Sequence, residues 1–487
     1  MNLFKIFPIC LRTSDFDVKI KVGESPNIKE FKADSIILSA KSDYFKAALS
    51  SRWARKENGI IIFDKSNISP PVFEILLNYI YTGTFSNNTE VSLLDIFIAA
   101  DEIGLVEISQ QVEDCLLKTV SAWKFPRDFI TICKYDTFTN LHETALNFMR
   151  NEALGYIKQG KFFKVLEFYE KILKNIPYNA EVQKNASSWD LSHYSCGSNE
   201  INELSRVISK NTTVTSLNLS KIRLGSINVN FRTSFFKRSE VNAGVKMLAD
   251  ALCKNSTLTY LNLYGNNLGS EGGKALAGAL CKNSTLTSLN LGCNKLGSEG
   301  GKALADALCK NSTLTCLDLS ENELGFGEGK ALANALCKNS TLTCLNLEYN
   351  ELGSEGGKAL ADALCKNSTL TYLNLFYNNL RPDGGKALAD ALCKNSTLTY
   401  LELGYNYLGS LSSETGKALA DALYKNSTLT SLGLYWNCFG PEEGKALADT
   451  LCKNSTLTSL NLYCNIQGGK ALADALLQEL HTDLFES

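Results

Sequence analysis

Residues 256–283 read STLTYLNLYGNNLGSEGGKALAGALCKN, and this stretch decides the fold. The segment CKNSTLT, which closes one such unit and opens the next, begins at Cys253, Cys281, Cys309, Cys337, Cys365, Cys393 and Cys452. The step is 28 residues from Cys253 to Cys393, then 31 to Tyr424, which takes the cysteine position, and 28 again. A fixed period between about 20 and 50 residues indicates a solenoid built from one repeated unit.

The first half of each unit predicts a short strand. Apolar and polar residues alternate in LTYLNL, residues 258–263. Successive side chains of a strand point to opposite faces, so we expect Leu261 and Leu263 to face the core and Tyr260 and Asn262 to face solvent. The leucines and the asparagine that follows them fit the leucine-rich pattern L-x-x-L-x-L-x-x-N-x-L.

The second half of each unit predicts a helix. Residues 272–283, GGKALAGALCKN, place Ala275, Leu276, Ala279 and Leu280 along one apolar stripe. A strand joined to a helix in every unit requires parallel strands with the helices on one side. Strands stack about 4.8 Å apart and helices about 8 to 10 Å apart, so the stack has to curve with its strands inside. The predicted fold is an α/β horseshoe with parallel strands on the concave face.

An asparagine recurs after eight of the ten strands, with Ile222 in its place in VTSLNLSKIRLG, and a buried amide has to find hydrogen-bond partners. We expect a ladder in which each side chain bonds to backbone groups at the turn that leaves its strand. The asparagine and serine of KNST are interpreted as turn residues at the helix end, and the preceding cysteine as a small apolar filler. The ladder residues are Asn266, Asn294, Asn322, Asn350, Asn378, Asn406, Asn437 and Asn465.

Two other interpretations compete for the repeated cysteine and its Asn-Ser-Thr sequon: a metal or redox ladder, and a glycosylated secreted surface. Only three histidines occur and no C-x2-C pair does, which argues against a metal site. Sequons are used only on chains that enter the secretory pathway. Helix-end cysteines one unit apart lie beyond the roughly 7 Å limit for a disulfide. The scaffold interpretation is favoured, and neither a metal nor a cofactor is expected.

The repeat frame extends back to SSWDLSHY, where Trp189 and Leu191 take the places of the strand leucines. We therefore assign residues 186–487 to the solenoid, with ten strands. About 16 extra residues at 226–241 and three before Gly416 break the period. Such insertions often lie on binding faces, and a tolerated bulge is the alternative. Residues 186 to 480 resemble the ribonuclease-inhibitor type of leucine-rich repeat, which implies a curved binding scaffold without identifying its ligand.

The overall composition excludes several kinds of partner. Lys and Arg total 49 against 51 Asp and Glu, with no run of like charge. We therefore expect neither nucleic acid nor a membrane as the main partner. No segment approaches 18 to 20 uninterrupted apolar residues, and the N-terminal MNLFKIFPICLRTSDFD lacks an A-x-A cleavage pattern. The prediction is a soluble protein of the cytoplasm or nucleus.

The first 120 residues have a different character. DFDVKIKV alternates like a strand, SPPVFEILLNYIYTG reads as a helix, and two more helices break at Gly104. Together these residues resemble the BTB, or POZ, domain, although Asp34 stands where that family usually has His. Residues 121–185 resemble a shortened BACK helical extension. The BTB resemblance rests on Asp17-Val18, Phe31-Lys32-Ala33, Ser42-Asp43-Tyr44-Phe45, Tyr79-Ile80-Tyr81-Thr82-Gly83, Ala99-Ala100-Asp101 and Gly104-Leu105.

The BTB resemblance implies docking onto the cullin scaffold of ubiquitin ligases. A hydrophobic-x-Glu motif in the loop after the YFKAAL helix often supports that docking in the family. In this chain the motif falls on Trp53, Ala54 and Arg55, so the apolar position is filled but the charge is reversed, and Glu57 lies two residues further on. The resemblance also implies homodimerisation, for which residues 1–14 offer Phe4, Ile6, Phe7 and Leu11.

The solenoid provides the candidate surface for a target protein. Core positions hardly vary between the units of this chain, whereas the outward strand positions differ and become aromatic in the last units, as suits an interface hot spot. Drift after recent duplication is the alternative. The target-binding candidates are Tyr372, Phe376, Tyr377, Tyr400, Tyr405, Tyr435, Trp436 and Tyr463.

No constellation of residues indicates catalysis, so we expect a protein that is not an enzyme. The first hypothesis is a protein-protein interaction adaptor that serves as substrate receptor of a cullin-RING ubiquitin ligase. Its partners are then a cullin and an unidentified target. Two alternatives stay open: a GTPase-regulating or inhibitory leucine-rich-repeat scaffold that uses the 226–241 insertion, and a BTB oligomerisation scaffold without a ligase role.

Overall fold

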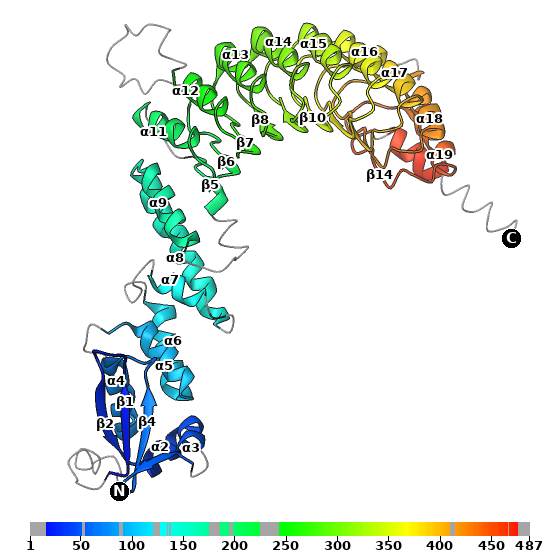
Figure 1. Ribbon diagram of the computed structural model, residues 1–487. Helices are drawn as coiled ribbons and strands as arrows, with labels where there is room; N and C mark the ends of the chain where they lie inside the picture. The colour runs from blue at the N-terminus through cyan, green and yellow to red at the C-terminus, as the bar shows by residue number, and fades with distance from the viewer. Residues whose placement is uncertain are drawn as a thin grey trace, which may run out of the picture. The chain divides into compact units, whose positions relative to one another are not determined.

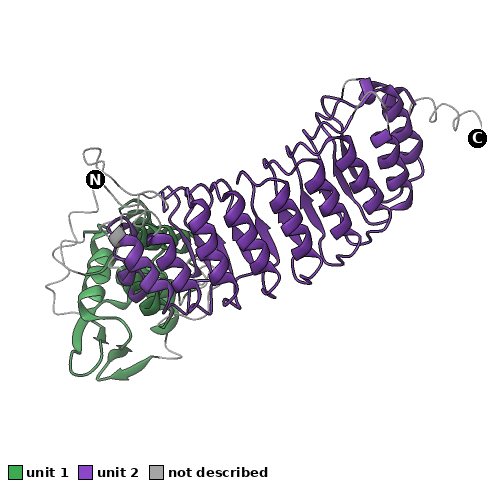
Figure 2. Ribbon diagram, turned by 90° about the horizontal axis from the view of Figure 1, so that it is seen from above, with its two compact units in different colours: residues 1–154, 168–182 green, residues 155–167, 183–487 purple. Residues whose placement is uncertain are grey.

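The computed structural model describes residues 16–50, 54–86, 91–119, 127–133, 135, 138–174, 186–193, 198–224, 243–409, 414–465 and 467–475 (Figure 1). The chain divides into two compact units (Figure 2). Unit 1 comprises residues 1–154 and 168–182, and unit 2 comprises residues 155–167 and 183–487. The predicted roles of residues 226–241 and of Phe4, Ile6, Phe7 and Leu11 concern segments outside the described residues.

Unit 1 is built on a four-stranded mixed sheet in the order β2-β1-β4-β3. The central strand β1 pairs antiparallel with β2 and parallel with β4, and β3 pairs antiparallel with β4. Val18, Ile20 and Val22 alternate along β1 and are fully buried, as the period of a strand requires. The strands are β1 Val18–Val22, β2 Lys29–Ala33, β3 Arg55–Glu57 and β4 Ile60–Lys65.

Helices cover this sheet and supply most of the core of unit 1. Helix α4 begins with two prolines, which the first turn of a helix tolerates, and ends at Gly83 in the left-handed conformation. Gly104, also left-handed with φ 69°, separates α5 from α6 as the sequence predicts. The helices are α2 Ser35–Lys41, α3 Asp43–Ala48, α4 Pro70–Thr82, α5 Leu93–Glu102, α6 Val106–Lys118, α7 Arg127–Ile132, α8 Thr139–Lys158 and α9 Phe162–Leu173.

Asp34, which departs from the family pattern, has a structural role at the start of α2. Its side chain accepts hydrogen bonds from the backbone N–H groups of Ile36 and Ile37. Its own N–H donates to the hydroxyl of Tyr81 at 2.8 Å. Asp34 is therefore the N-cap of α2, a position that aspartate fills well.

Unit 2 contains a ten-stranded parallel sheet whose strands follow one another in chain order, as predicted. Neighbouring strands pair in the register of the repeat, so that Leu261 lies opposite Leu289 and Leu345 opposite Leu373. The strands are β5 Ser188–Asp190, β6 Ser216–Asn218, β7 Tyr260–Asn262, β8 Ser288–Asn290, β9 Cys316–Asp318, β10 Cys344–Asn346, β11 Tyr372–Asn374, β12 Tyr400–Glu402, β13 Ser431–Gly433 and β14 Ser459–Asn461.

The helices of unit 2 lie side by side on the outer side of a curved stack, with the strands on the inner side (Figure 1). In α13, Leu276, Ala279 and Leu280 are buried as expected. The second alanine of the stripe is Ala277, whereas Ala275 is only half-buried, because the helix is rotated by part of a turn. The helices are α11 Ser198–Ile208, α12 Ala243–Leu252, α13 Gly269–Leu280, α14 Gly297–Leu308, α15 Phe326–Leu336, α16 Gly353–Leu364, α17 Arg381–Leu392, α18 Glu414–Lys425 and α19 Pro441–Leu451.

The predicted asparagine ladder runs through the stack. Fully buried Asn294 accepts hydrogen bonds from the backbone of Asn266 and Leu268 in the preceding unit. Its amide group donates to the carbonyl oxygens of Leu263, Leu291 and Gly292 at 2.8 to 3.0 Å. Each ladder amide thus ties two units together, which explains why the residue recurs.

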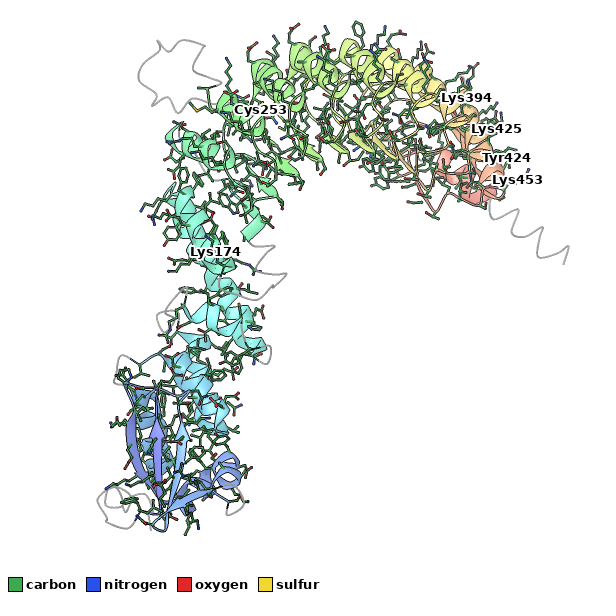
Figure 3. All side chains as sticks on the ribbon, viewed as in Figure 1. Lys174, Cys253, Lys394, Tyr424, Lys425 and Lys453 are labelled. Atoms are coloured by element: carbon green, nitrogen blue, oxygen red, sulfur yellow. The ribbon has the colours of Figure 1, made fainter. Side chains whose placement is uncertain are left out.

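A second ladder comes from the asparagine of every KNST segment. Asn283 is buried, and its amide group donates to the carbonyl oxygen of Leu252 at the end of the preceding helix. Its side-chain oxygen accepts from the N–H groups of Thr285 and Leu286. The sequon asparagines from Asn255 to Asn426 are therefore interior groups of the folded stack, and Asn454 in the last unit is half-buried. The cysteine position beside them lies on the helix side of the stack. Figure 3 labels Cys253 there, together with Tyr424, which occupies the cysteine position in a later unit.

Candidate interaction surfaces

The inner face of unit 2 is shaped by a left-handed residue directly before each ladder asparagine. Gly265 takes this conformation at no steric cost, with φ 68°. The equivalent residues in later units are Tyr349, Tyr377, Tyr405 and Trp436, with φ between 51° and 56°. A positive φ is unfavourable for a bulky side chain, so these units hold aromatic rings where glycine would fit more easily. The same position is left-handed in the other units as well, at Cys293, Glu321 and Cys464, so this conformation belongs to the repeat and not to the aromatic residues.

The rings form a continuous network across four units. The Tyr349 ring lies 5.1 Å from Phe376, and Phe376 lies 5.2 Å from Tyr435. Tyr405 stacks on Trp436 at 5.0 Å between ring centroids. Phe376 is buried beneath the others, whereas Tyr349 and Trp436 keep 44% of their surface exposed. A rigid, partly exposed aromatic surface of this kind suits a protein interface.

The structure brings five of the eight target-binding candidates into this network: Phe376, Tyr377, Tyr405, Tyr435 and Trp436. Tyr372 and Tyr400 form a separate pair, stacked at 4.3 Å with rings 8° apart. Tyr463 is 71% exposed and has no ring contact among the described residues. Tyr349 was missed, although it stands 28 residues before Tyr377 at the same position of the unit, which was the available signal.

Carboxylates border the aromatic network. Burial, followed by repulsion from Asp318 and Glu321, raises the pKa of Glu348, although its hydrogen bond from Asn374 opposes this. Burial and the charge of Glu348 likewise raise the pKa of Glu402. The charged form of both side chains is therefore disfavoured on this face of the isolated chain.

Two glycines create the space in which Glu402 lies. A Cβ atom at Gly433, directly opposite Glu402 on the next strand, would overlap the carboxylate. The N–H of Gly404 donates to the Glu402 carboxylate at 2.8 Å, and a Cβ atom at Gly404 would meet the ring of Tyr435 at 2.8 Å. Only 8% of Glu402 is exposed as a result. Burial and the nearby carboxylates also raise the pKa of Tyr435 to about 12.

Carboxylates on the outer and inner faces of unit 2 differ in whether they form ion pairs. On the helices, lysines form ion pairs with acidic residues of their own unit or of the next unit. Lys274, for example, contacts Glu271 in its own helix at 3.2 Å and Glu299 in the next helix at 3.4 Å. Further pairs of this kind join Lys302 to Glu328, Lys330 to Glu355, Lys358 to Glu355 and Asp383, and Lys386 to Glu414. Within the described part of the chain, the inner-face Asp318, Glu321, Glu348 and Glu402 form no ion pair. Unlike the carboxylates of the helices, these four are thus not paired with a lysine.

The candidate cullin-docking segment is partly described. Trp53 lies outside the described residues. Arg55 and Glu57 form the exposed edge strand β3 and not a loop, and their side chains pair with each other at 2.7 Å. The positive charge at Arg55 is therefore paired with the carboxylate two residues away.

Neither a metal site nor a membrane-spanning helix is found in the regions that the structure describes. No group of three or more His, Cys, Asp and Glu side chains there could hold a metal ion. No helix there is long and apolar enough to cross a membrane.

Two families match this chain. The BTB/POZ domain matches residues 10–119, which contain the four-stranded sheet and helices α2 to α6 of unit 1. The Leucine Rich repeat matches residues 254–277, 282–305, 310–327, 338–361 and 366–389. The resemblances drawn from the sequence are confirmed for these segments: the chain combines a BTB/POZ domain with leucine-rich repeats.

Curated relatives match the BTB region. Kelch repeat and BTB domain-containing protein 4 of Homo sapiens is 30% identical over 116 residues, 24% of this chain and 20% of that protein. TD and POZ domain-containing protein 1 of Mus musculus is 28% identical over 145 residues, 30% of this chain and 39% of that protein. The chain thus spans well under half the length of the curated relatives that it matches.

Two solved structures are similar to parts of this chain, at low identity. The BTB domain of zebrafish PATZ1 covers 21% of this chain and 77% of its own, at 23% identity and a TM-score of 0.18. Leiomodin-1 Actin-Binding Site 2 covers 42% of this chain and 95% of its own, at 20% identity and a TM-score of 0.26. Neither similarity assigns a partner.

A BTB/POZ domain and leucine-rich repeats are both protein-interaction modules, which are typically not catalytic. The chain is accordingly a protein-interaction adaptor, with at least two surfaces through which it can contact other proteins.

Proposed function

We propose that this adaptor is the substrate receptor of a cullin-RING ubiquitin ligase in the cytoplasm or nucleus. The BTB domain docks onto the cullin and mediates self-association, and the inner face of the repeats binds the protein to be ubiquitinated. The observation that carries the proposal is the combination of a BTB domain with a separate unit whose inner face holds a partly exposed aromatic network.

The composition of the inner face defines the target chemistry. Tyr and Trp side chains provide large contact areas at low entropic cost, and the adjoining carboxylates lack cationic partners. A target segment that carries Arg or Lys would pair with the accessible carboxylates, among them Glu348, while its apolar parts contact the rings. We therefore infer that the target presents a basic segment with apolar or aromatic residues.

Calorimetric titration of the full chain with the N-terminal region of the BTB-specific cullin tests the docking step. We expect binding in the micromolar range or tighter, lost in Trp53→Ala and strengthened in Arg55→Glu, which restores the family's acidic residue. The exposed Lys174→Ala variant serves as a control with unchanged binding. No detectable binding by folded protein would overturn cullin docking and leave an oligomerisation scaffold as the better description.

Self-association is measured separately by light scattering on the same protein. A mass of twice 53.4 kDa supports the proposed homodimer. A mass of 53.4 kDa at all concentrations overturns it, without deciding whether the cullin binds.

A further inference from the structure

Two cysteines stand directly opposite each other on the inner face. Cys316 in β9 and Cys344 in β10 are partners in the parallel register, and both side chains are half-buried. Neighbouring strands lie about 4.8 Å apart, which falls within the Cα separation of about 4.4 to 6.8 Å found in disulfides. Residues opposite each other in a sheet also direct their side chains to the same face, so the two sulfur atoms share one location.

The two thiols are joined by a hydrogen bond and lie in a row with Ser288. The Cys316 sulfur receives hydrogen bonds from Cys344 first and then from Ser288, which lower the pKa of Cys316 to about 7. Asp318 on the same strand opposes this effect. The pKa of Cys344 is raised, because its proton is held between the two sulfurs. A lowered pKa favours the thiolate of Cys316, and the thiolate is the nucleophilic form of cysteine.

We propose that Cys316 and Cys344 form a reversible oxidation site, at which hydrogen peroxide converts the two thiols to a disulfide between β9 and β10. The Cys316 thiolate attacks one peroxide oxygen, the O–O bond breaks, and the leaving hydroxide takes a proton to become water. Cys316 is then a sulfenic acid. The Cys344 sulfur attacks the Cys316 sulfur, the S–S bond forms, and the S–O bond breaks with loss of a second water. Two thiols and one peroxide thus give one disulfide and two waters.

The remaining cysteines provide the contrast within the same chain. Cys281, Cys309 and Cys337 stand at helix ends, where neighbouring helices are separated by about 8 to 10 Å, beyond the reach of a disulfide. They are exposed, so their failure to pair would not reflect a lack of access. The inner-face pair differs from them in spacing and in the hydrogen bonds on Cys316.

The site lies between the two parts of the inner face. Tyr372 of the stacked tyrosine pair is opposite Cys344, and Asp318 follows Cys316 by two residues on its strand. The oxidation chemistry does not depend on the proposed ligase function. If the inner face binds the target, oxidation at this place alters that surface.

Trypsin separates the relevant cysteines, which permits a direct test. Cys316 is the only cysteine of residues 311–330, Cys344 the only one of residues 339–358, and Cys337 the only one of residues 331–338. Reduced full-length protein is treated with increasing hydrogen peroxide, blocked with N-ethylmaleimide, digested without reductant and measured by mass spectrometry. We expect a linked pair of 311–330 with 339–358, lighter by two hydrogens than the sum of the peptides, at peroxide levels that leave 331–338 alkylated. Dithiothreitol should release the pair.

Three variants make the outcome decisive. Cys344→Ser should abolish the linked pair and leave Cys316 as a trappable sulfenic acid, Ser288→Ala should slow the reaction, and Cys281→Ser should leave it unchanged. Circular dichroism confirms that each variant is folded. The proposal is overturned if 331–338 is oxidised or cross-linked as readily as the inner-face peptides, or if 311–330 and 339–358 remain fully alkylated.

Discussion

At the residue scale, the buried amides decide how firmly the units hold together. One side chain such as Asn294 both accepts from and donates to the backbone in two successive units. A buried backbone group without a partner costs about 1 to 3 kcal/mol. The ladder asparagines therefore hold neighbouring units together. An apolar side chain of similar size would leave the buried backbone groups around it unpaired.

We predict that Asn294→Ala destabilises the protein by about 2 to 4 kcal/mol, because it leaves several buried backbone groups unpaired at once. Urea unfolding followed by circular dichroism measures this change. Asn290→Ala in the same unit is the matched control: it removes a single hydrogen bond, from the N–H of Gly292, at a half-exposed site. We expect less than about 1 kcal/mol there, and equal losses for the two variants would contradict the ladder's role.

Glu402 gives a pH-dependent prediction. Its pKa is raised in the folded chain by burial and by Glu348, above the value of the unfolded chain. Folding therefore bears a cost at neutral pH, where the carboxylate is charged in both states. That cost disappears as the pH falls through the raised folded pKa towards the unfolded value of about 4.3.

Glu402→Gln should accordingly raise the melting temperature at pH 7, with a difference from the parent chain that shrinks as the pH is lowered towards about 4. Differential scanning calorimetry across this range measures the trend. Glu323→Gln, at an exposed position of the same face, is the control. A difference for Glu402→Gln that does not vary with pH would show that packing, and not ionisation, is responsible.

At the scale of the elements, the first turns of adjacent helices approach unusually closely. A Cβ atom at Gly273 in α13 would lie 2.9 Å from the Cα atom of Gly300 in α14. The same arrangement recurs between Gly329 and Gly356, at 3.0 Å. Glycine at the beginning of these helices is therefore required by contact between backbones, and each helix packs on its neighbour through these positions as well as through its alanines.

The same substitution at two positions of α13 should have opposite effects. Gly273→Ala forces two backbones apart, and we predict a loss of about 1 to 3 kcal/mol. Gly278→Ala meets no atom within 4 Å and replaces the residue with the greatest backbone freedom, so we predict a gain of about 0.5 to 1 kcal/mol. Urea unfolding of both variants measures this contrast. Changes of the same sign would contradict the packing described.

At the scale of the whole molecule, the core positions of the repeat units are nearly constant, whereas the positions on the inner face vary from unit to unit. The leucines, asparagines and glycines of the core recur in nearly every unit, whereas the inner-face positions change from carboxylates in the middle units to aromatic rings in the last ones. Lysines neutralise the acidic residues of the outer face but not those of the inner face. The charge of the inner face is therefore available to a partner.

A peptide array incubated with the labelled full chain tests this conclusion. We predict that bound peptides are enriched in Arg and Lys together with apolar or aromatic residues, and that binding weakens as salt is raised. Tyr405→Ala with Trp436→Ala should reduce the signal at least about tenfold, as expected for two hot-spot residues. Lys394→Ala, on the helix side, is the control. Enrichment of acidic peptides would contradict the assignment.

Much of the fold could be predicted because the same residue pattern recurs in many units. The period of Leu261 and Leu263 specifies the strand, and the leucine and asparagine positions specify the parallel stack. The ten strands are confirmed, and hydrogen bonds of the first asparagine ladder are present in the structure. The second ladder, through Asn283, was interpreted only as turn chemistry, because its bond to Leu252 joins residues 31 apart in sequence.

The sequence by itself determined the two modules and the order of the strands, since these follow from local periodicity repeated along the chain. Only the tertiary structure decided which residues of the inner face meet: Tyr349 joins Phe376, Glu402 lies in the space left by Gly433, and Cys316 stands opposite Cys344. The physical reason is that contacts across strands depend on register, rotamer and the left-handed turns. Those quantities are set by the packing of neighbouring units and not by the pattern within any one of them.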